Sequence, residues 1–255
     1  MARVTVLQLD PAAPLDRFGP WLDELGIEVD VVEVWRDGLP ADLGGGLLIL
    51  GGTMDAYAED AHPFLRELRQ VIAERVRTDQ PTLGICLGHQ VIAVALGGAV
   101  DVGAGEERGL VEVHWLADAA TDPLVGEAAR AGLTVAASDH RDGIPRGAGQ
   151  PRLPEGARVL GESEGFVQAM RVGSTWGLQF HPEASPDLME AWSARAQAPD
   201  TADMVTALRT AEARLVALGR SIAHAFGRLV LDSLRPEARA AAPGPTDSPT
   251  PEDRG

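Results

Sequence analysis

The chain of 255 residues contains neither lysine nor asparagine, so all 22 of its basic residues are arginines. A Walker P-loop and a Schiff base to pyridoxal phosphate each need a lysine, and both are therefore excluded. There are 38 acidic residues, and the formal net charge is −16. A chain with this acidic balance binds nucleic-acid phosphates and anionic lipids poorly, so we expect neither as a partner.

Cysteine occurs once, as Cys86. A single cysteine excludes an intramolecular disulfide and a thiolate-rich zinc site. No stretch approaches the ~18 consecutive apolar residues of a membrane-spanning helix. The N-terminus leads directly into a strand-like run and lacks the pattern of a signal peptide. We therefore expect a cytoplasmic protein with no membrane segment.

The first half of the sequence alternates short β-rich runs with longer amphipathic ones. A regular β-α-β-α order is typical of a parallel sheet with helices on both faces. The short run Leu47–Leu50 is wholly apolar, as expected of a strand that is covered on both sides. The expected strands are Val4–Leu9, Ile27–Val34, Leu47–Leu50 and Thr82–Ile85, and the expected helices are Pro14–Leu25, Pro63–Arg77 and His89–Leu96.

The middle of the chain is rich in strand-like runs with few helices between them, which favours hairpin connections. Gly173 and Ser174 are typical of a tight turn between two such runs. The segment Arg141–Pro154 is rich in glycine and proline, which predicts an exposed loop. The expected strands are Leu110–Leu116, Leu133–Ala137, Arg158–Glu162, Phe166–Val172 and Thr175–Phe180.

The pattern becomes helical after Pro186, and Thr201–Leu234 predicts one long amphipathic helix or two. Together these patterns predict an α/β fold: a flavodoxin-like, mostly parallel sheet with helices on both faces, extra antiparallel strands and a C-terminal helical extension. We expect one domain over residues 1–235, with the extension at 187–235. Proline, alanine, aspartate and serine dominate residues 236–255, which we expect to be a disordered tail.

Gly84–Gln90 connects a short apolar strand to a helix and has the form Gly-x-Cys-x-Gly around Cys86. This is the pattern of a nucleophile elbow, in which flanking glycines allow close backbone packing at a strained turn. The N-terminus of the following helix supplies free N–H groups and partial positive charge, which favour a thiolate. The alternative is that Cys86 is a small buried apolar residue.

A thiolate that attacks an amide needs a proton donor for the leaving amine, and histidine oriented by a carboxylate is the usual one. His181 directly follows the last expected strand, and Glu183 is two residues further on. This spacing predicts a catalytic triad of Cys86, His181 and Glu183. By itself, His181 would be interpreted as an ordinary loop histidine.

Gly84–Gln90 together with His181–Glu183 resembles the class I (triad) glutamine amidotransferases, most of all the stand-alone GMP-synthase-like amidotransferase domains. The similarity also includes Leu50–Asp55 and Ser138–Asp142. The resemblance implies hydrolysis of glutamine to glutamate and ammonia through a γ-glutamyl thioester on Cys86.

The resemblance also implies a role for each residue around the thiol. His181 would be the acid and base, and Glu183 would orient it. The backbone N–H groups of Gly52 and Leu87 would form the oxyanion hole, and Gln90 matches a family position that contacts the substrate glutamine. Thr53 departs from the proline of many relatives, which makes the loop around Gly52 less rigid.

Three functions stay open because no synthetase motif accompanies these residues. They are a glutaminase that supplies a separate synthetase partner, a hydrolase of γ-glutamyl amides or peptides, and a non-catalytic regulatory subunit. The expected ligand is glutamine or a γ-glutamyl compound, and a homodimer is also open. No cofactor and no metal are expected, because Asp139–Asp142 lacks a further ligand set and favours a structural or substrate-edge role. His89 is expected to pack or cap and not to act as a second base.

Overall fold

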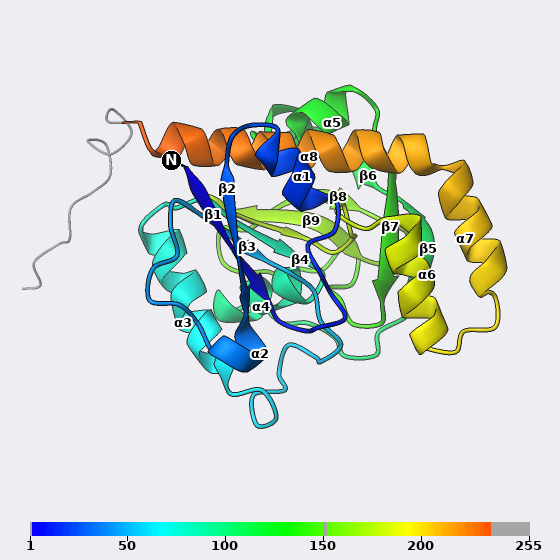
Figure 1. The fold of residues 1–255 in the computed structure, drawn as a ribbon, viewed down its shortest axis with the longest axis horizontal. Coiled ribbons are helices and arrows are strands. Elements are labelled where there is room, and N and C mark those ends of the chain that lie inside the picture. The colour runs from blue at the N-terminus through cyan, green and yellow to red at the C-terminus, as the bar shows by residue number, and fades with distance from the viewer. Residues whose placement is uncertain (1, 150–151, 236–255) are drawn as a thin grey trace, which may run out of the picture.

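The computed structural model describes residues 2–149 and 152–235. Its centre is an eight-stranded sheet in the order β2-β1-β3-β4-β10-β9-β8-β6 (Figure 1). The strands from β2 to β10 in this order are parallel, whereas β9, β8 and β6 continue the sheet in antiparallel pairs. The expected α/β fold is confirmed. The strands of this sheet are β1 (Arg3–Gln8), β2 (Glu28–Glu33), β3 (Gly46–Ile49), β4 (Thr82–Ile85), β6 (His114–Trp115), β8 (Arg158–Glu162), β9 (Val167–Val172) and β10 (Thr175–Leu178).

Helices cover both faces of the sheet. Successive side chains of a strand point to opposite faces, so each buried strand contributes to a core on either side. Leu48 belongs to an apolar core shared with α1, α5 and α8, whereas Leu47 and Ile49 belong to an apolar core shared with α3 and α4. The helices are α1 (Phe18–Asp23), α2 (Val34–Asp37), α3 (Phe64–Arg77), α4 (Leu87–Ala95), α5 (Gly126–Arg130), α6 (Pro186–Arg195), α7 (Thr201–Thr210) and α8 (Glu212–Ser233), and η1 (Ala117–Thr121) is a 3₁₀ turn.

A second, two-stranded antiparallel sheet pairs β5 (Glu107–Glu112) with β7 (Val135–His140). The single strand expected at Leu110–Leu116 is therefore wrong, because the chain changes sheets within it. Val113 is fully buried at the point of change, and the Trp115 indole N–H donates to Leu133 O at 2.8 Å. The Gly173–Ser174 turn is confirmed, since Val172 and Thr175 pair directly across it.

The N-terminal helix is shorter than the expected Pro14–Leu25, because α1 begins only at Phe18. Asp16 has a positive φ of 45°, which is incompatible with a right-handed helix. Its carboxylate accepts the Ser185 N–H at 2.7 Å, and this contact ties the loop to the segment that follows Glu183. A long-range hydrogen bond thus overrides the local helical pattern.

The sequence predicted an exposed loop at Arg141–Pro154. Among its described residues this prediction is wrong at Ile144, which is fully buried in the core beneath α4. The C-terminal helical pattern is confirmed as more than one helix, α6, α7 and α8 (Figure 1). The single domain over residues 1–235 stays a prediction, and the expected tail at 236–255 lies outside the described residues.

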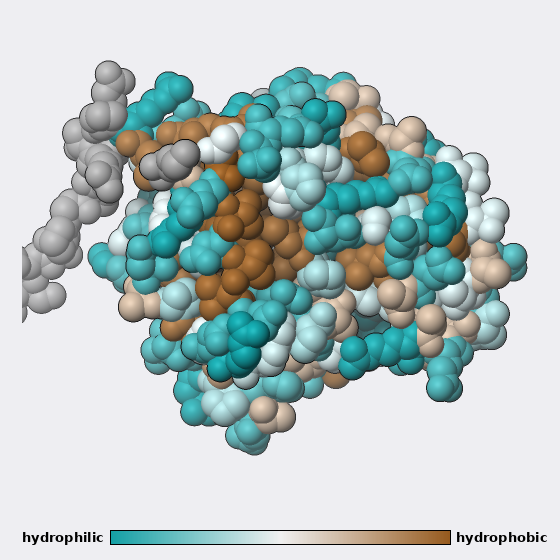
Figure 2. Space-filling model, viewed as in Figure 1, coloured by the Kyte–Doolittle hydropathy of each residue, from teal (hydrophilic) through white to brown (hydrophobic). Residues whose placement is uncertain are grey.

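The long helix α8 buries one side against the sheet. Ile222, Phe226 and Val230 are all fully buried, and a buried side chain of this size contributes roughly 1.5–3 kcal/mol. None of the helices in residues 2–149 and 152–235 has the length and apolar character that a membrane span requires. Figure 2 shows an apolar area over β1 and β2 on a largely hydrophilic surface, and Val31 of β2 is 44% exposed.

Gly219 brings α8 close to the loop that carries His181. A Cβ atom at this position would lie 2.1 Å from Pro182 O and 2.9 Å from the Trp21 ring. We expect Gly219→Ala to lower the free energy of unfolding by about 1–3 kcal/mol through overpacking, although alanine is favoured by ~1 kcal/mol in an open helix. Urea unfolding followed by tryptophan fluorescence measures the change. Ala217→Gly, at an exposed position of α8, is the control for the effect of helix propensity alone. A Gly219→Ala variant with a higher free energy of unfolding than the wild type would contradict the packing argument.

Candidate active site

Cys86 lies at a sharp turn between β4 and α4. Its backbone has φ 51° and ψ −107°, a region that non-glycine residues rarely adopt. A Cβ at Gly84 would lie 2.5 Å from the carbonyl of Gly88, and a Cβ at Gly88 would lie 2.3 Å from Ile49 O. The two glycines therefore permit a backbone contact that no other residue allows, and the strained turn is the expected elbow.

His181 follows β10 and is fixed by contacts at both its backbone and its ring. Its N–H donates to Ala137 O of β7 at 2.8 Å, and its Nδ1 lies 2.7 Å from Glu183 Oε1. The exposed fractions of His181 and Glu183 are 4% and 1%. Because Glu183 occupies Nδ1, the other ring nitrogen is left to face Cys86, which lies beside the same residue, Gly51, as the imidazole.

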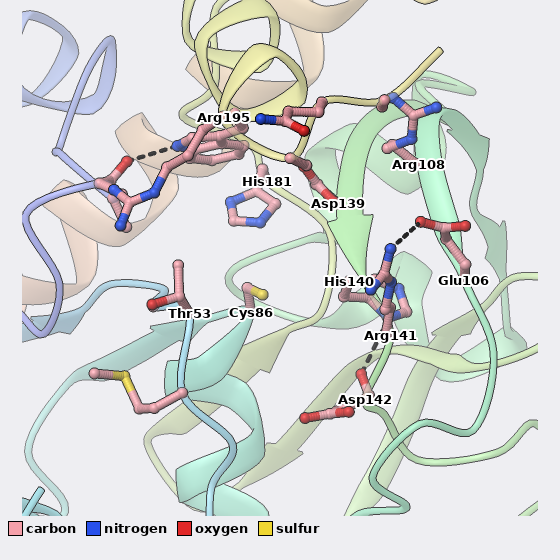
Figure 3. Close-up of a pocket in the computed structure, with 18 of the residues that line it drawn as sticks. Thr53, Cys86, Glu106, Arg108, Asp139, His140, Arg141, Asp142, His181 and Arg195 are labelled. Carbon is pink, nitrogen blue, oxygen red and sulfur yellow. Dashed lines mark hydrogen bonds and ion pairs between the residues drawn. The ribbon is translucent and has the colours of Figure 1, made fainter. Parts of the chain in front are cut away.

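The electrostatics of this group favour a charged imidazole. Burial by itself would lower the pKa of His181, but the Glu183 carboxylate and the Cys86 thiol outweigh burial and raise that pKa well above its ordinary value. An imidazolium beside Cys86 in turn favours the thiolate form of the sulfur. In Figure 3 the Cys86 sulfur lies below the His181 ring, at the edge of an open cavity.

The cavity has a volume of about 670 Å³ and extends from Gly52 and Thr53 on one side to Arg141 and Asp142 on the other. Cys86 and His181 both line it, and the end of α6 covers part of it. Cys86, the His181 ring held by Glu183 and a concave space are thus together at the carboxyl edge of the parallel sheet, where α/β proteins bind their ligands.

Comparison with known proteins agrees with this geometry. Residues 21–193 match the family model described as glutamine amidotransferase class-I. The chain belongs to the class I glutamine amidotransferases. It is 33% identical over 166 residues to one of the subunits of a glutamine-hydrolysing GMP synthase from Halobacterium salinarum, a match that covers 63% of this chain and 77% of the relative.

Two solved structures extend the similarity beyond the family match. A glutamine amidotransferase from Thermotoga maritima has a TM-score of 0.75 at 27% identity, over 90% of this chain and 98% of its own. A glutamine amidotransferase from Methylobacillus flagellatus has a TM-score of 0.73 at 26% identity, over 91% of this chain and 95% of its own. The helices that follow His181 are thus included in the structural similarity.

The amides expected to form the oxyanion hole lie next to the elbow of this amidotransferase. A Cβ at Gly52 would lie 2.8 Å from the Leu87 side chain, so the two residues are in close contact. The Gly52 N–H donates no hydrogen bond within the described residues. Leu87 is the first residue of α4, where an N–H has no acceptor in its own helix. Both amides are available to an oxyanion.

Thr53 is held in place by a residue that the sequence analysis did not single out. The buried Asp10 carboxylate accepts the Thr53 N–H at 3.0 Å and also the Thr53 hydroxyl. Burial acts to raise the pKa of Asp10, but the hydrogen bonds from Thr53 and from Ala12 N–H outweigh it and lower that pKa. The loop beside Gly52 is therefore braced by hydrogen bonds to Asp10.

Gln90 lines the cavity, but its amide is already engaged. Its Nε2 donates to Asp142 O at 2.9 Å and approaches Gln179 Oε1 at 3.3 Å. Asp142 O also accepts from the His140 ring at 3.0 Å. Gln90 thus anchors the loop that forms the far wall of the cavity, and its contact with substrate stays a prediction.

The remaining histidines near the elbow have structural surroundings. His89 is fully buried, and burial lowers its pKa to about 3, so it is neutral. The Nδ1 atom of His140 contacts Asp142 O, as described above, and its Nε2 atom lies 3.1 Å from Glu107 Oε2. Within residues 2–149 and 152–235, no group of three or more histidine, cysteine or acidic side chains is arranged to hold a metal ion.

We expect Glu183→Gln to lower the pKa of His181 by roughly 1–3 pH units, because burial is then no longer opposed by the Glu183 carboxylate. The imidazolium would lose its proton at lower pH, and catalysis would fall by roughly 10²–10⁴-fold. NMR titration of the histidine side chains measures the pKa. The exposed Glu67→Gln is the matched control, and an unchanged His181 titration would contradict the assigned cause.

Proposed function

We propose that this amidotransferase releases ammonia from glutamine through a covalent thioester on Cys86. The observation that carries the proposal is the contact series from Cys86 through His181 to Glu183 at the wall of a cavity. Class membership supports the same chemistry.

In the proposed reaction, the proton of the Cys86 thiol already resides on His181, as the raised pKa of that ring favours, and the Cys86 thiolate attacks the amide carbon. The oxyanion that develops is stabilised by the N–H groups of Gly52 and Leu87. His181 then gives its proton to the leaving nitrogen, and the carbon–nitrogen bond breaks. Water, deprotonated by the same ring, hydrolyses the thioester. Glu183 keeps the ring in the tautomer that this sequence requires.

We propose that the ammonia passes to a separate synthetase subunit. The relative from Halobacterium salinarum is named as one subunit of a glutamine-hydrolysing GMP synthase, which supports a divided arrangement of this kind. A homodimer stays a prediction beside it. The non-catalytic alternative is disfavoured because a regulatory chain has no need of a strained Cys86 backbone.

A γ-glutamyl hydrolase is the second candidate function, and the size of the cavity favours it. A volume of about 670 Å³ is typical of sites for drug-sized ligands. Free glutamine is much smaller than such ligands. The acyl chemistry at Cys86 is the same for both substrates, so the leaving group alone distinguishes them.

Incubation of the full chain with glutamine tests the proposal. We expect equal amounts of glutamate and ammonia, and Cys86→Ala should reduce both to the uncatalysed background. Because Cys86 is the sole cysteine, a glutamine-like electrophile such as 6-diazo-5-oxonorleucine should add its mass once to the wild type and not to Cys86→Ala.

An intact mass that stays unmodified, together with no release of ammonia from glutamine or of amine from γ-glutamyl amides, would favour the regulatory function. Release from γ-glutamyl amides without release from glutamine would favour the second candidate.

A further inference from the structure

Two side chains of α6 face the catalytic cavity. Trp192 and Arg195 are three residues apart, and residues with this spacing share one side of a helix. Both line the cavity, and Figure 3 shows Arg195 extending from α6 toward the Thr53 side of Cys86. Neither residue belongs to a sequence motif that indicates a function.

Trp192 fixes the position of α6 relative to the catalytic histidine. Its ring centroid lies 4.7 Å from that of His181, and the two planes are tilted by 58°. Its indole N–H donates to Ala12 O at 2.6 Å. The Ala12 N–H in turn donates to Asp10 at 2.8 Å, and Asp10 also holds Thr53. The end of α6 is thus tied to the wall next to Gly52.

Arg195 has no carboxylate partner within the described residues, although the protein has an excess of acidic residues. Two other cavity arginines are neutralised: Arg108 pairs with Asp200, and Arg141 lies 3.3 Å from Glu106. Asp10 attracts Arg195 electrostatically, but its carboxylate is engaged by Thr53 and Ala12. Arg195 is therefore the cavity guanidinium, in the part of the chain that the structure describes, that is free to bind an anion.

The proposed reaction determines which part of a substrate lies near this guanidinium. The leaving nitrogen receives its proton from His181, so the leaving group must lie beside that ring. Trp192 covers the ring, and Arg195 is one helical turn further along α6. The glutamyl part is then directed to the opposite wall, where Gln90 and Asp142 lie.

We propose that Trp192 and Arg195 form a subsite for a leaving group that carries a carboxylate, so that the substrate class includes γ-glutamyl amides of amino acids. This inference rests on the proposed thioester chemistry and specifies its substrate. Trp192 supplies an apolar surface for the body of the leaving amino acid, and Arg195 binds its carboxylate. Ammonia, a neutral and much smaller leaving group, would use neither residue.

The bonds and protons balance as they do for glutamine. A carbon–sulfur bond to Cys86 forms, the carbon–nitrogen bond of the γ-glutamyl amide breaks, and the amino acid leaves with the proton from His181. Water then cleaves the carbon–sulfur bond, which yields glutamate and regenerates the thiol. No oxidant, reductant or further co-reactant is needed.

A matched pair of substrates tests the subsite. γ-Glutamylalanine and γ-glutamylethylamide differ only in the carboxylate of the leaving group. We expect the wild type to prefer γ-glutamylalanine by about 10- to 100-fold in kcat/KM, the range of a charge-assisted hydrogen bond. Arg195→Gln should bring the ratio to about one, and Arg195→Lys should keep part of it. Arg214→Gln, an exposed arginine of α8 with no ion pair among the described residues, should leave the ratio unchanged.

A wild-type ratio near one, or a ratio that Arg195→Gln leaves unchanged, would overturn the subsite. Equal losses for both substrates would also overturn it, because Arg195 would then bind the α-carboxylate that they share. Calorimetric binding of both compounds to Cys86→Ala separates this inference from the catalytic proposal. A preference for γ-glutamylalanine in binding supports the subsite even if turnover is absent, and equal affinities reject it.

Discussion

Close backbone packing at the turn after β4 is the constraint on which the rest of the active site depends. The carbonyl of Ile49, at the end of β3, packs so closely on Gly88 at the start of α4 that a Cβ there would lie 2.3 Å from its oxygen. Cys86 has a strained backbone at this turn, and its Cβ lies beside Gly51 of the loop that follows the same strand β3. Cys86 and the neighbouring backbone amides of Gly52 and Leu87 are therefore positioned by one junction of two parallel strands.

Two buried histidines show how the surroundings of a ring decide whether it can carry a proton. His89 is fully buried with no carboxylate beside its ring in the described part of the chain, and its pKa falls to about 3. His181 is almost as deeply buried, but Glu183 and Cys86 hold its pKa well above the ordinary value. Burial costs both rings their hydration, and only the ring with charged neighbours remains able to carry a proton.

Much of this architecture could be predicted from local patterns. Thr82–Ile85 and Arg158–Glu162 are strands with the predicted bounds, because a short apolar run between turn residues has few other stable conformations. The elbow could be predicted as well, because the glycines that its close packing requires are only two residues from Cys86 in the sequence. The spatial meeting of Cys86, His181 and Glu183 follows from two strand ends that share an edge of the sheet.

The features that local patterns did not predict depend on partners far away in the sequence. Asp16 delays the start of α1 because its carboxylate accepts the Ser185 N–H, and Asp10 braces Thr53 across the sheet edge. No periodicity encodes contacts of this kind, which arise only when the chain is folded.

The C-terminal helices show the same limitation and explain why a helical extension belongs to the active site. Gly219 lets α8 approach the carbonyl of Pro182, between His181 and Glu183, and Trp192 of α6 packs on the His181 ring. The loop is thus enclosed by elements that precede and follow it in the chain. In an amphipathic pattern, a glycine or a tryptophan indicates only which side of a helix is buried. Its effect on the imidazole depends on the neighbour that the fold provides, and here that neighbour is the base that the proposed reaction requires.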